Sequence, residues 1–174
     1  MERLEQTGKT HLINGVQIKA RKKTTNKWFE TQDSINYWDD FSKQKLVWTP
    51  VNSEYRFTVL PEEMYFNNSL FMITGKDLCY LCGILNSKLF VFYFNMLLSS
   101  GSYAYGSRDF FCGIPILKAL NQETKEKMEA LVREILVSNQ LEYSNLCKKI
   151  DNLVYSIYDI TDEMQMYIEK NTYL

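Results

Sequence analysis

The spacing of apolar residues changes along the chain, and each change predicts a different kind of element. Pro50 and Pro61 mark turns between short apolar runs that are typical of β-strands. These runs are Lys45–Trp48, Tyr55–Val59 and Leu70–Thr74. A further extended stretch is expected around residues 12–18, and Asp33 or Ser34 is expected to cap a short helix through residues 37–41.

From Asp77 the apolar spacing becomes helical. One face is shared by four apolar residues, Leu78, Leu81, Cys82 and Leu85. Asn86-Ser87 predicts a break before a second apolar stretch that ends at Leu98. Residues 78–98 are long enough to cross a bilayer, but a lysine at the centre, Lys88, would cost a few kcal/mol there. We therefore predict a buried core helix in two pieces.

After Pro115 the period is helical throughout. Asn121 and an acidic first turn open the first apolar stripe, which comprises Met128, Leu131, Val132, Ile135 and Leu136. The second stripe comprises Leu146, Ile150, Leu153, Val154, Ile157 and Tyr158. Thr161 is expected to cap a last helix over residues 162–170.

These patterns predict an α+β fold, in which a small mixed β-sheet unit with a buried central helix precedes a C-terminal helical hairpin or bundle. The expected divisions are a basic N-terminal segment over residues 1–27, an α/β unit over 28–118 and a helical region over 119–174. A chain of 174 residues is long enough for one compact domain with a helical appendage.

The charge is unevenly distributed, although the formal net charge is only −1. Residues 1–60 hold 10 Lys/Arg against 7 Asp/Glu, residues 61–118 hold 4 against 4, and residues 119–174 hold 6 against 10. A polyanion would therefore meet the N-terminal part. The overall acidity argues against a stand-alone, tight, nonspecific nucleic-acid binder. The start carries no apolar leader segment, so we expect a reducing cytoplasm and four free cysteines.

The residue types that usually carry catalysis are sparse. Cys79 and Cys82 form a Cys-x-x-Cys pair, but zinc would need two further ligands, and the single histidine, His11, has no partner near it in sequence. The cysteines are better explained as small core residues. We predict no catalytic residue and no metal site in this chain.

A polar loop over residues 99–108 is the strongest candidate for molecular recognition. It contains residues that suit contacts with base edges or phosphates: Ser102, Tyr103, Tyr105, Ser107 and Arg108. A basic set is the candidate for phosphate contact: Lys19, Arg21, Lys22, Lys23 and Lys45. The alternatives are a tight glycine-rich connection at 99–108 and a merely solvated basic loop at 19–27.

Four stretches carry a resemblance to a known family. They are Trp28–Trp38 continuing through Phe41 to Trp48, then Tyr80–Leu89, Phe110–Ile116 and Ile150–Glu163. Their order and spacing over residues 28–170 resemble the C-terminal specificity domain of TaqI-like adenine-N6 DNA methyltransferases, found in type IIG restriction-modification enzymes. Two departures are a missing second proline after Pro115 and Met164 in place of an acid.

The resemblance implies a target-recognition domain that grips double-stranded DNA and reads its sequence in the major groove without catalysis. The Asn/Asp-Pro-Pro-Tyr motif and glycine-rich cofactor loop of the methyltransferase are absent from the sequence. We therefore expect a piece of a larger enzyme, with S-adenosylmethionine and Mg²⁺ used only by methyltransferase and nuclease domains on the same or a partner polypeptide, and no membrane. The alternative is part of a type I restriction specificity subunit whose helices dock a methyltransferase partner.

Overall fold

The computed structural model describes residues 9–19, 24–27, 30, 33, 35–49, 56–67, 69–99, 112–119 and 121–172. The chain divides into two compact units, residues 1–39 and residues 40–174, and each is described by itself. The break falls later than the predicted boundary after residue 27.

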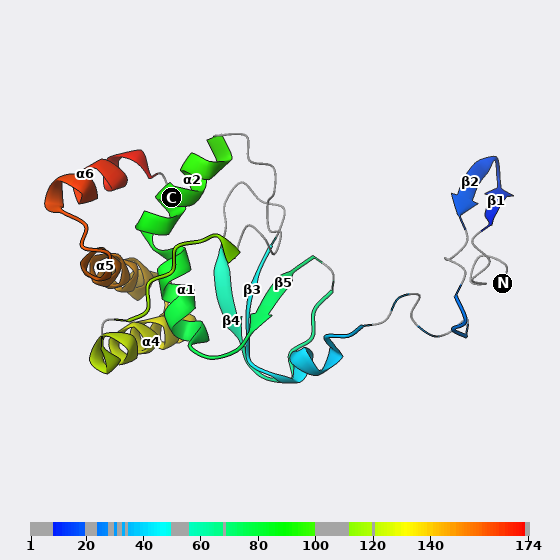
Figure 1. Cartoon of the computed structure of the whole chain (residues 1–174), viewed down its shortest axis with the longest axis horizontal. Coiled ribbons are helices and arrows are strands. Elements are labelled where there is room, and N and C mark those ends of the chain that lie inside the picture. Colours follow the sequence, from blue (N-terminus) through cyan, green and yellow to red (C-terminus); the bar gives the residue numbers. More distant parts are fainter. Residues whose placement is uncertain are drawn as a thin grey trace. The chain divides into compact units, whose positions relative to one another are not determined.

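The N-terminal unit contains a β-hairpin (Figure 1). Strand β1, Thr10–Ile13, pairs antiparallel with β2, Val16–Lys19. The turn between them is Asn14-Gly15, with φ of 50° and 79°. Positive φ at both turn residues is the geometry of a type I′ turn, for which Asn-Gly is the favoured pair. The extended stretch predicted over residues 12–18 is therefore two short strands with a turn at its centre.

The second unit begins at Asp40, inside a 3-10 helix, η1, Trp38–Ser42. This helix starts later than the one predicted from Asp33 or Ser34, and the sheet follows it. Strands β3, Lys45–Trp48, β4, Phe57–Leu60, and β5, Phe71–Thr74, lie in the order β4-β3-β5.

This sheet is antiparallel, not mixed as predicted: β3 runs opposite to both neighbours. The physical reason is the length of the connection after β3. A parallel neighbour needs a crossover of a dozen or more residues, whereas only residues 49–56 join β3 to β4.

One face of the sheet carries the aromatic part of the core. Leu46 lies opposite Val59 and Ile73, and Trp48 lies opposite Phe57 and Phe71. The Trp48 ring centroid is 5.7 Å from each of the last two rings. All four positions of β3 are buried, as expected for a central strand covered on both faces.

Two helices follow with a sharp break between them. Helix α1, Leu78–Asn86, ends at Ser87, whose N–H and Oγ–H both donate to the carbonyl of Ile84. Helix α2, Lys88–Ser99, then starts, and the carbonyl of Ser87 accepts from the N–H of Val91. The predicted break at Asn86-Ser87 is confirmed.

Within the described part of the chain, no single helix has the length and apolar character to cross a membrane. The pair formed by α1 and residues 88–97 has both, with a 65° bend between its halves.

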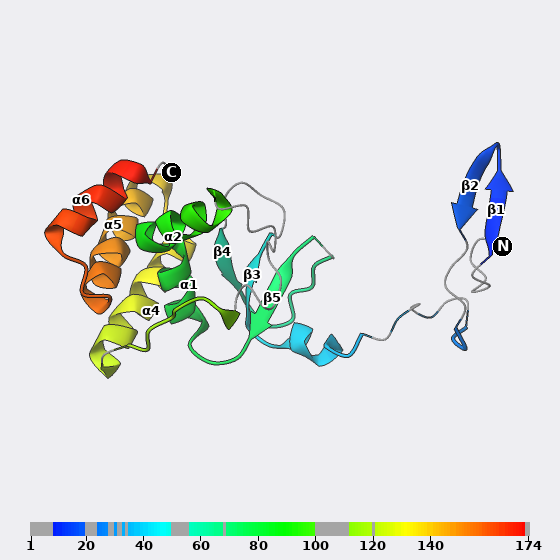
Figure 2. The same ribbon diagram turned by 45° about the horizontal axis from the view of Figure 1, so that its top comes forward.

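Three helices complete the fold: α4, Gln122–Val137, α5, Gln140–Ile157, and α6, Asp162–Asn171. The predicted caps are confirmed, because the side chain of Asn121 accepts from the N–H of Thr124 at 2.8 Å and Thr161 Oγ1 accepts from that of Met164 at 3.3 Å. Helix α1 lies between the sheet on one side and α4 and α5 on the other (Figures 1 and 2).

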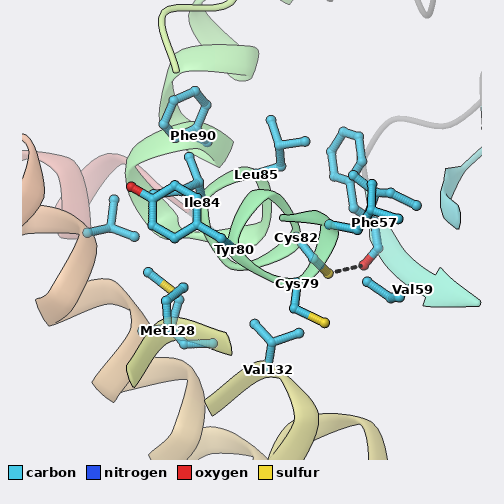
Figure 3. Packing of buried hydrophobic residues seen from close by; sticks show 14 of the residues in the cluster. Phe57, Val59, Cys79, Tyr80, Cys82, Ile84, Leu85, Phe90, Met128 and Val132 are labelled. Carbon is cyan, nitrogen blue, oxygen red and sulfur yellow. Dashed lines mark hydrogen bonds between the residues drawn. The ribbon is translucent and has the colours of Figure 1, made fainter. Parts of the chain in front are cut away.

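The core is continuous from the sheet to the C-terminal helices (Figure 3). Gly83 lets α1 approach α4 closely, because a Cβ at this position would collide with Met128 and would lie 3.2 Å from Val132 Cγ2. The predicted α+β fold with a buried central helix is confirmed. The predicted boundary at residue 118, however, separates segments that share this core.

Candidate nucleic-acid interface

The residues that flank segment 100–111 are held firmly in the second unit. Segment 100–111 itself lies outside the described residues. Helix α2 leads into it and is fixed by Phe90 and Phe94, each 2% exposed. The ring centroid of Phe90 lies 5.6 Å from that of Tyr158 on the C-terminal side of α5, in an edge-on pair.

The start of α2 is bound to α5 by a buried carboxylate. Asp151 Oδ1 accepts from the N–H of Lys88 at 2.8 Å, and so satisfies one of the free donors of the helix N-terminus. Burial raises the pKa of Asp151, and the Lys88 N–H partly offsets this effect. The side chain thus ties together two helices that are 63 residues apart in sequence.

The segment that follows residue 111 is anchored by two tyrosines. The Tyr80 hydroxyl donates to the carbonyl of Leu117 at 3.0 Å. The Tyr158 hydroxyl accepts from the N–H of Leu117 and donates to the carbonyl of Pro115, both at 3.0 Å. Burial raises the pKa of Tyr80 to about 12 and raises that of Tyr158, so both stay protonated and able to donate.

These hydrogen bonds hold residues 115–117 close to the core, where we predicted that the chain returns to the interior. Among residues 112–119 no strand forms, but Ile114 is buried in the core. Helix α2 is packed in the core before residue 100 and residues 114–117 are held after residue 111, so that the framework fixes the chain on both sides of segment 100–111.

Lys45 requires a correction. We predicted a phosphate contact, but the residue is 0% exposed. Its Nζ donates to the carbonyls of Phe41, Pro61 and Met64 at 2.8, 3.2 and 3.1 Å. A buried ammonium must be hydrogen-bonded, and these three acceptors use its three protons inside the fold. No donor is left for a phosphate.

The other predicted contact residues stay predictions. Ser102, Tyr103, Tyr105, Ser107, Arg108, Arg21, Lys22 and Lys23 lie outside the described residues. Lys19 ends strand β2, where the structure describes its backbone but not its side chain.

The two cysteines that were the alternative candidates for chemistry, Cys79 and Cys82, are both buried. Burial raises the pKa of Cys79, and it raises that of Cys82 to about 12, which disfavours the reactive thiolate. The Cys82 thiol instead donates to the carbonyl of Phe57 at 3.5 Å (Figure 3). Within the described residues, no group of three or more His, Cys, Asp or Glu side chains is placed to hold a metal ion.

Sequence reasoning missed the residues that hold the framework. Tyr80, Asp151 and Tyr158 each occur in a helical apolar stripe, or beside one, where a polar group breaks the pattern. A buried polar atom needs a hydrogen-bond partner, so the sequence could have indicated that these three side chains make structural hydrogen bonds. The identity of the partner follows only from the tertiary structure.

A three-stranded sheet, a broken central helix and anchored residues before α4 define a small α+β scaffold. The model of the TaqI-like C-terminal specificity domain matches residues 2–116, about two thirds of the chain. The chain belongs to this family, whose members are specificity domains of restriction-modification enzymes and are generally non-catalytic. No curated protein matches the chain.

The family match differs in extent from the predicted resemblance over residues 28–170. It begins at residue 2 and therefore includes the β1–β2 hairpin. It ends at Ile116, so that helices α4, α5 and α6 lie beyond it. The anchoring bonds of Tyr158 thus join the C-terminal helices to the last residues of the family match.

Proposed function

We propose that this chain recognises a specific sequence in double-stranded DNA, as the specificity domain of a type IIG restriction-modification enzyme. The family match over residues 2–116 is the observation that carries the proposal. Its support in the structure is the rigid framework on both sides of segment 100–111, because direct readout needs side chains presented from a fixed scaffold.

The charge of the N-terminal unit supports binding to the DNA backbone. Residues 9–27 hold six Lys/Arg and no Asp/Glu, and they include the hairpin. Positive charge of this density gives affinity for phosphates without sequence preference. In the proposed division of roles, residues of this segment contact phosphates and residues of 102–108 read base edges.

Reactions on DNA are assigned to other domains. We propose that methyltransferase and nuclease domains, on this or a partner polypeptide, bind S-adenosylmethionine and Mg²⁺, and that this chain selects the site at which they act. In this role the chain works in the cytoplasm.

Arg108 provides the sharpest test. Duplexes selected from a random library by the parent enzyme are labelled, and their binding is measured by fluorescence anisotropy at fixed salt. We expect Arg108→Ala to weaken binding of the selected duplex by about 1–3 kcal/mol and to relax preference at one base pair. Arg133→Ala is the control, since Arg133 lies on α4 beyond the family match and pairs with Glu129 at 2.8 Å. Equal affinity and equal preference for Arg108→Ala would remove this residue from the reading set.

A second candidate is a type I specificity subunit whose helices dock a methyltransferase subunit. The observation that favours it is a set of exposed apolar side chains on α6, namely Met164, Met166 and Tyr167. Light scattering after size exclusion, with and without a candidate methyltransferase subunit, distinguishes the cases. A stable complex that is lost in Met166→Glu supports the type I arrangement, and a complex unaffected by that change counts against it.

A further inference from the structure

A cavity of about 630 Å³ lies between the sheet and the helices of the second unit. Its walls come from β4, α1 and α2, which lie in the family match, and from α4 and α5, which lie beyond it. The volume falls within the range of about 300–1,000 Å³ that is typical of small-molecule sites. The proposed reading of DNA does not involve this cavity.

The interior of the cavity is apolar. Side chains of the core line it, among them Phe57, Phe94, Val132 and Ile150, which are each at most 5% exposed. Figure 3 shows Phe57, Cys82 and Val132 of this wall around α1. Such walls favour an apolar body, whose burial contributes about 25 cal/mol for each Å² removed from water.

The charged groups at the cavity are mainly positive. Arg56, Lys88 and Lys148 line it, against the single carboxylate of Asp151. That carboxylate already accepts from the N–H of Lys88. Charges beside low-dielectric walls act more strongly on a ligand than charges in open water. Lys88 also pairs with Glu169 at 3.7 Å, so that three positive charges stand against two negative ones, and the remaining excess of one positive charge favours an anion.

Polar groups without formal charge complete the lining. Asn95, Tyr143 and Ser144 can donate hydrogen bonds to oxygen atoms of a ligand, whereas the amide of Asn86 already donates to the carbonyls of Phe57 and Cys82. Apolar walls with a few convergent polar groups are the usual composition of a ligand site.

We propose that this cavity binds a small amphipathic anion, with an apolar body against Phe94, Val132 and Ile150 and one carboxylate, sulfonate or phosphate group among Arg56, Lys88 and Lys148. The proposal does not depend on DNA recognition, and its test uses no DNA. A ligand in this position contacts both the family-matched part and the C-terminal helices, so that its binding stabilises their packing.

The probe is 8-anilino-1-naphthalenesulfonate, an apolar anion whose fluorescence rises on burial. We expect saturable binding of one molecule per full-length chain. Ser144→Trp, which places a large ring at the cavity, is expected to weaken binding at least tenfold. Asn145→Trp is the matched control, because Asn145 is the exposed neighbour that does not line the cavity. Equal binding by both variants would overturn the site.

The anionic part of the proposal has its own test. Lys148→Glu reverses a charge at the cavity, whereas Lys149→Glu reverses the charge of a neighbour that does not line it. We expect the first variant to bind the sulfonate probe at least fivefold more weakly and the second to bind it as wild type does. The neutral analogue N-phenyl-1-naphthylamine should bind both variants equally. Sulfonate binding that is indifferent to Lys148→Glu would contradict the requirement for an anion.

Cys147 reports the location of the probe. Its side chain lines the cavity, Cys112 is exposed, and Cys79 and Cys82 are buried. In a Cys112→Ser background, saturating probe is expected to slow alkylation of Cys147 by iodoacetamide at least fivefold at pH 8.5. An unchanged alkylation rate would place the probe elsewhere and overturn the assignment. A melting curve for each variant verifies that it is folded.

Discussion

The two sides of helix α1 are held by different kinds of contact. On the sheet side, backbone groups are bound by charged or polar side chains: Asn86 of α1 binds both backbone groups of Phe57, and beside the sheet itself Lys45 donates to three carbonyls outside α1. On the helical side, Gly83 packs against Met128, Lys88 N–H donates to Asp151, and Lys125 of α4 pairs with Asp77 at the start of α1. The cavity of about 630 Å³ lies beside this packing, and Phe57 of β4 also contributes to its wall.

The difference teaches where this fold tolerates change. A buried polar group with all its partners satisfied is costly to remove, because each partner is then left without its bond. Apolar packing beside a cavity can adjust to small changes in shape. We therefore expect substitutions on the sheet side to destabilise the protein more than substitutions on the helical side.

The largest effect is expected for Lys45→Met. The change keeps the apolar stem but leaves the carbonyls of Phe41, Pro61 and Met64 without their shared donor. The free energy of unfolding should fall by about 3 kcal/mol, since hydrogen bonds to a charged group contribute about 1.5–3 kcal/mol. Urea denaturation measures it. Lys43→Met is the control, because Lys43 is exposed and its pair with Asp40 is of the surface kind that contributes about 0–1 kcal/mol.

Asn86→Ala tests the second polar anchor of the sheet. The amide of Asn86 accepts from the N–H of Phe57 at 3.0 Å and donates to its carbonyl at 2.8 Å. Their loss should lower the free energy of unfolding by about 1.5 kcal/mol, and hydrogen exchange at the Phe57 amide should accelerate. Asn152→Ala, at an exposed position of α5, should change stability by less than about 0.5 kcal/mol. Equal effects of the two variants would contradict the anchoring role.

Gly83→Ala probes the packing on the helical side. Alanine stabilises a helix by about 1 kcal/mol relative to glycine, but its Cβ would collide with Met128. Overpacking costs about 1–3 kcal/mol, so the expected result is a net loss of about 1 kcal/mol. In a Met128→Ala background the collision is absent, and Gly83→Ala should then stabilise the protein. A loss of the same size in both backgrounds would contradict the packing explanation.

The smallest effect is expected for Asp151→Asn, which retains an oxygen acceptor for the N–H of Lys88. Burial raises the pKa of Asp151 in the folded protein, whereas in the unfolded chain it titrates near the ordinary value of about 3.9. Between these two values the folded state binds more protons, so this group's contribution to stability is lost as pH rises through that window. Asp151→Asn has no titrating group at this position, so its stability does not fall with rising pH for this reason.

Chemical denaturation at pH values from 4 to 8 measures whether the stability of Asp151→Asn relative to wild type rises or falls with pH. The stability of Asp151→Asn relative to wild type should increase as pH rises, and at pH 7 the variant should be within about 0.5 kcal/mol of wild type or more stable. A relative stability that decreases with pH would mean that the ionised carboxylate is favoured in the fold. That result would make Asp151 resemble Lys45 and remove the distinction between the two sides.

Much of the fold followed from local patterns. The bounds of β3 were predicted to the residue, and β5 to within one residue, because apolar β-formers with turns beside them leave few alternatives. The caps Asn121 and Thr161 were predicted from residue type. The hairpin was not, although Asn14-Gly15 is the strongest turn signal in the chain.

Features that depend on tertiary contacts could not be predicted from local sequence patterns. Lys45 was assigned to the surface because lysine is rarely buried, and only the carbonyls of residues far along the chain, Pro61 and Met64, explain its burial. The cavity arises where α1 and α2 meet α4 and α5, and no local pattern encodes that meeting. The residues of the predicted reading loop lie outside the described part of the chain and stay predictions.

The hydrogen bonds that secure residues 115–117 have a consequence for evolution. Tyr80 and Tyr158 bind only main-chain atoms of this segment, at Pro115 and Leu117. These bonds are indifferent to the side chains that precede them. If residues 100–111 read DNA as we propose, recombination that replaces them would give a descendant a new target sequence while these main-chain bonds are kept.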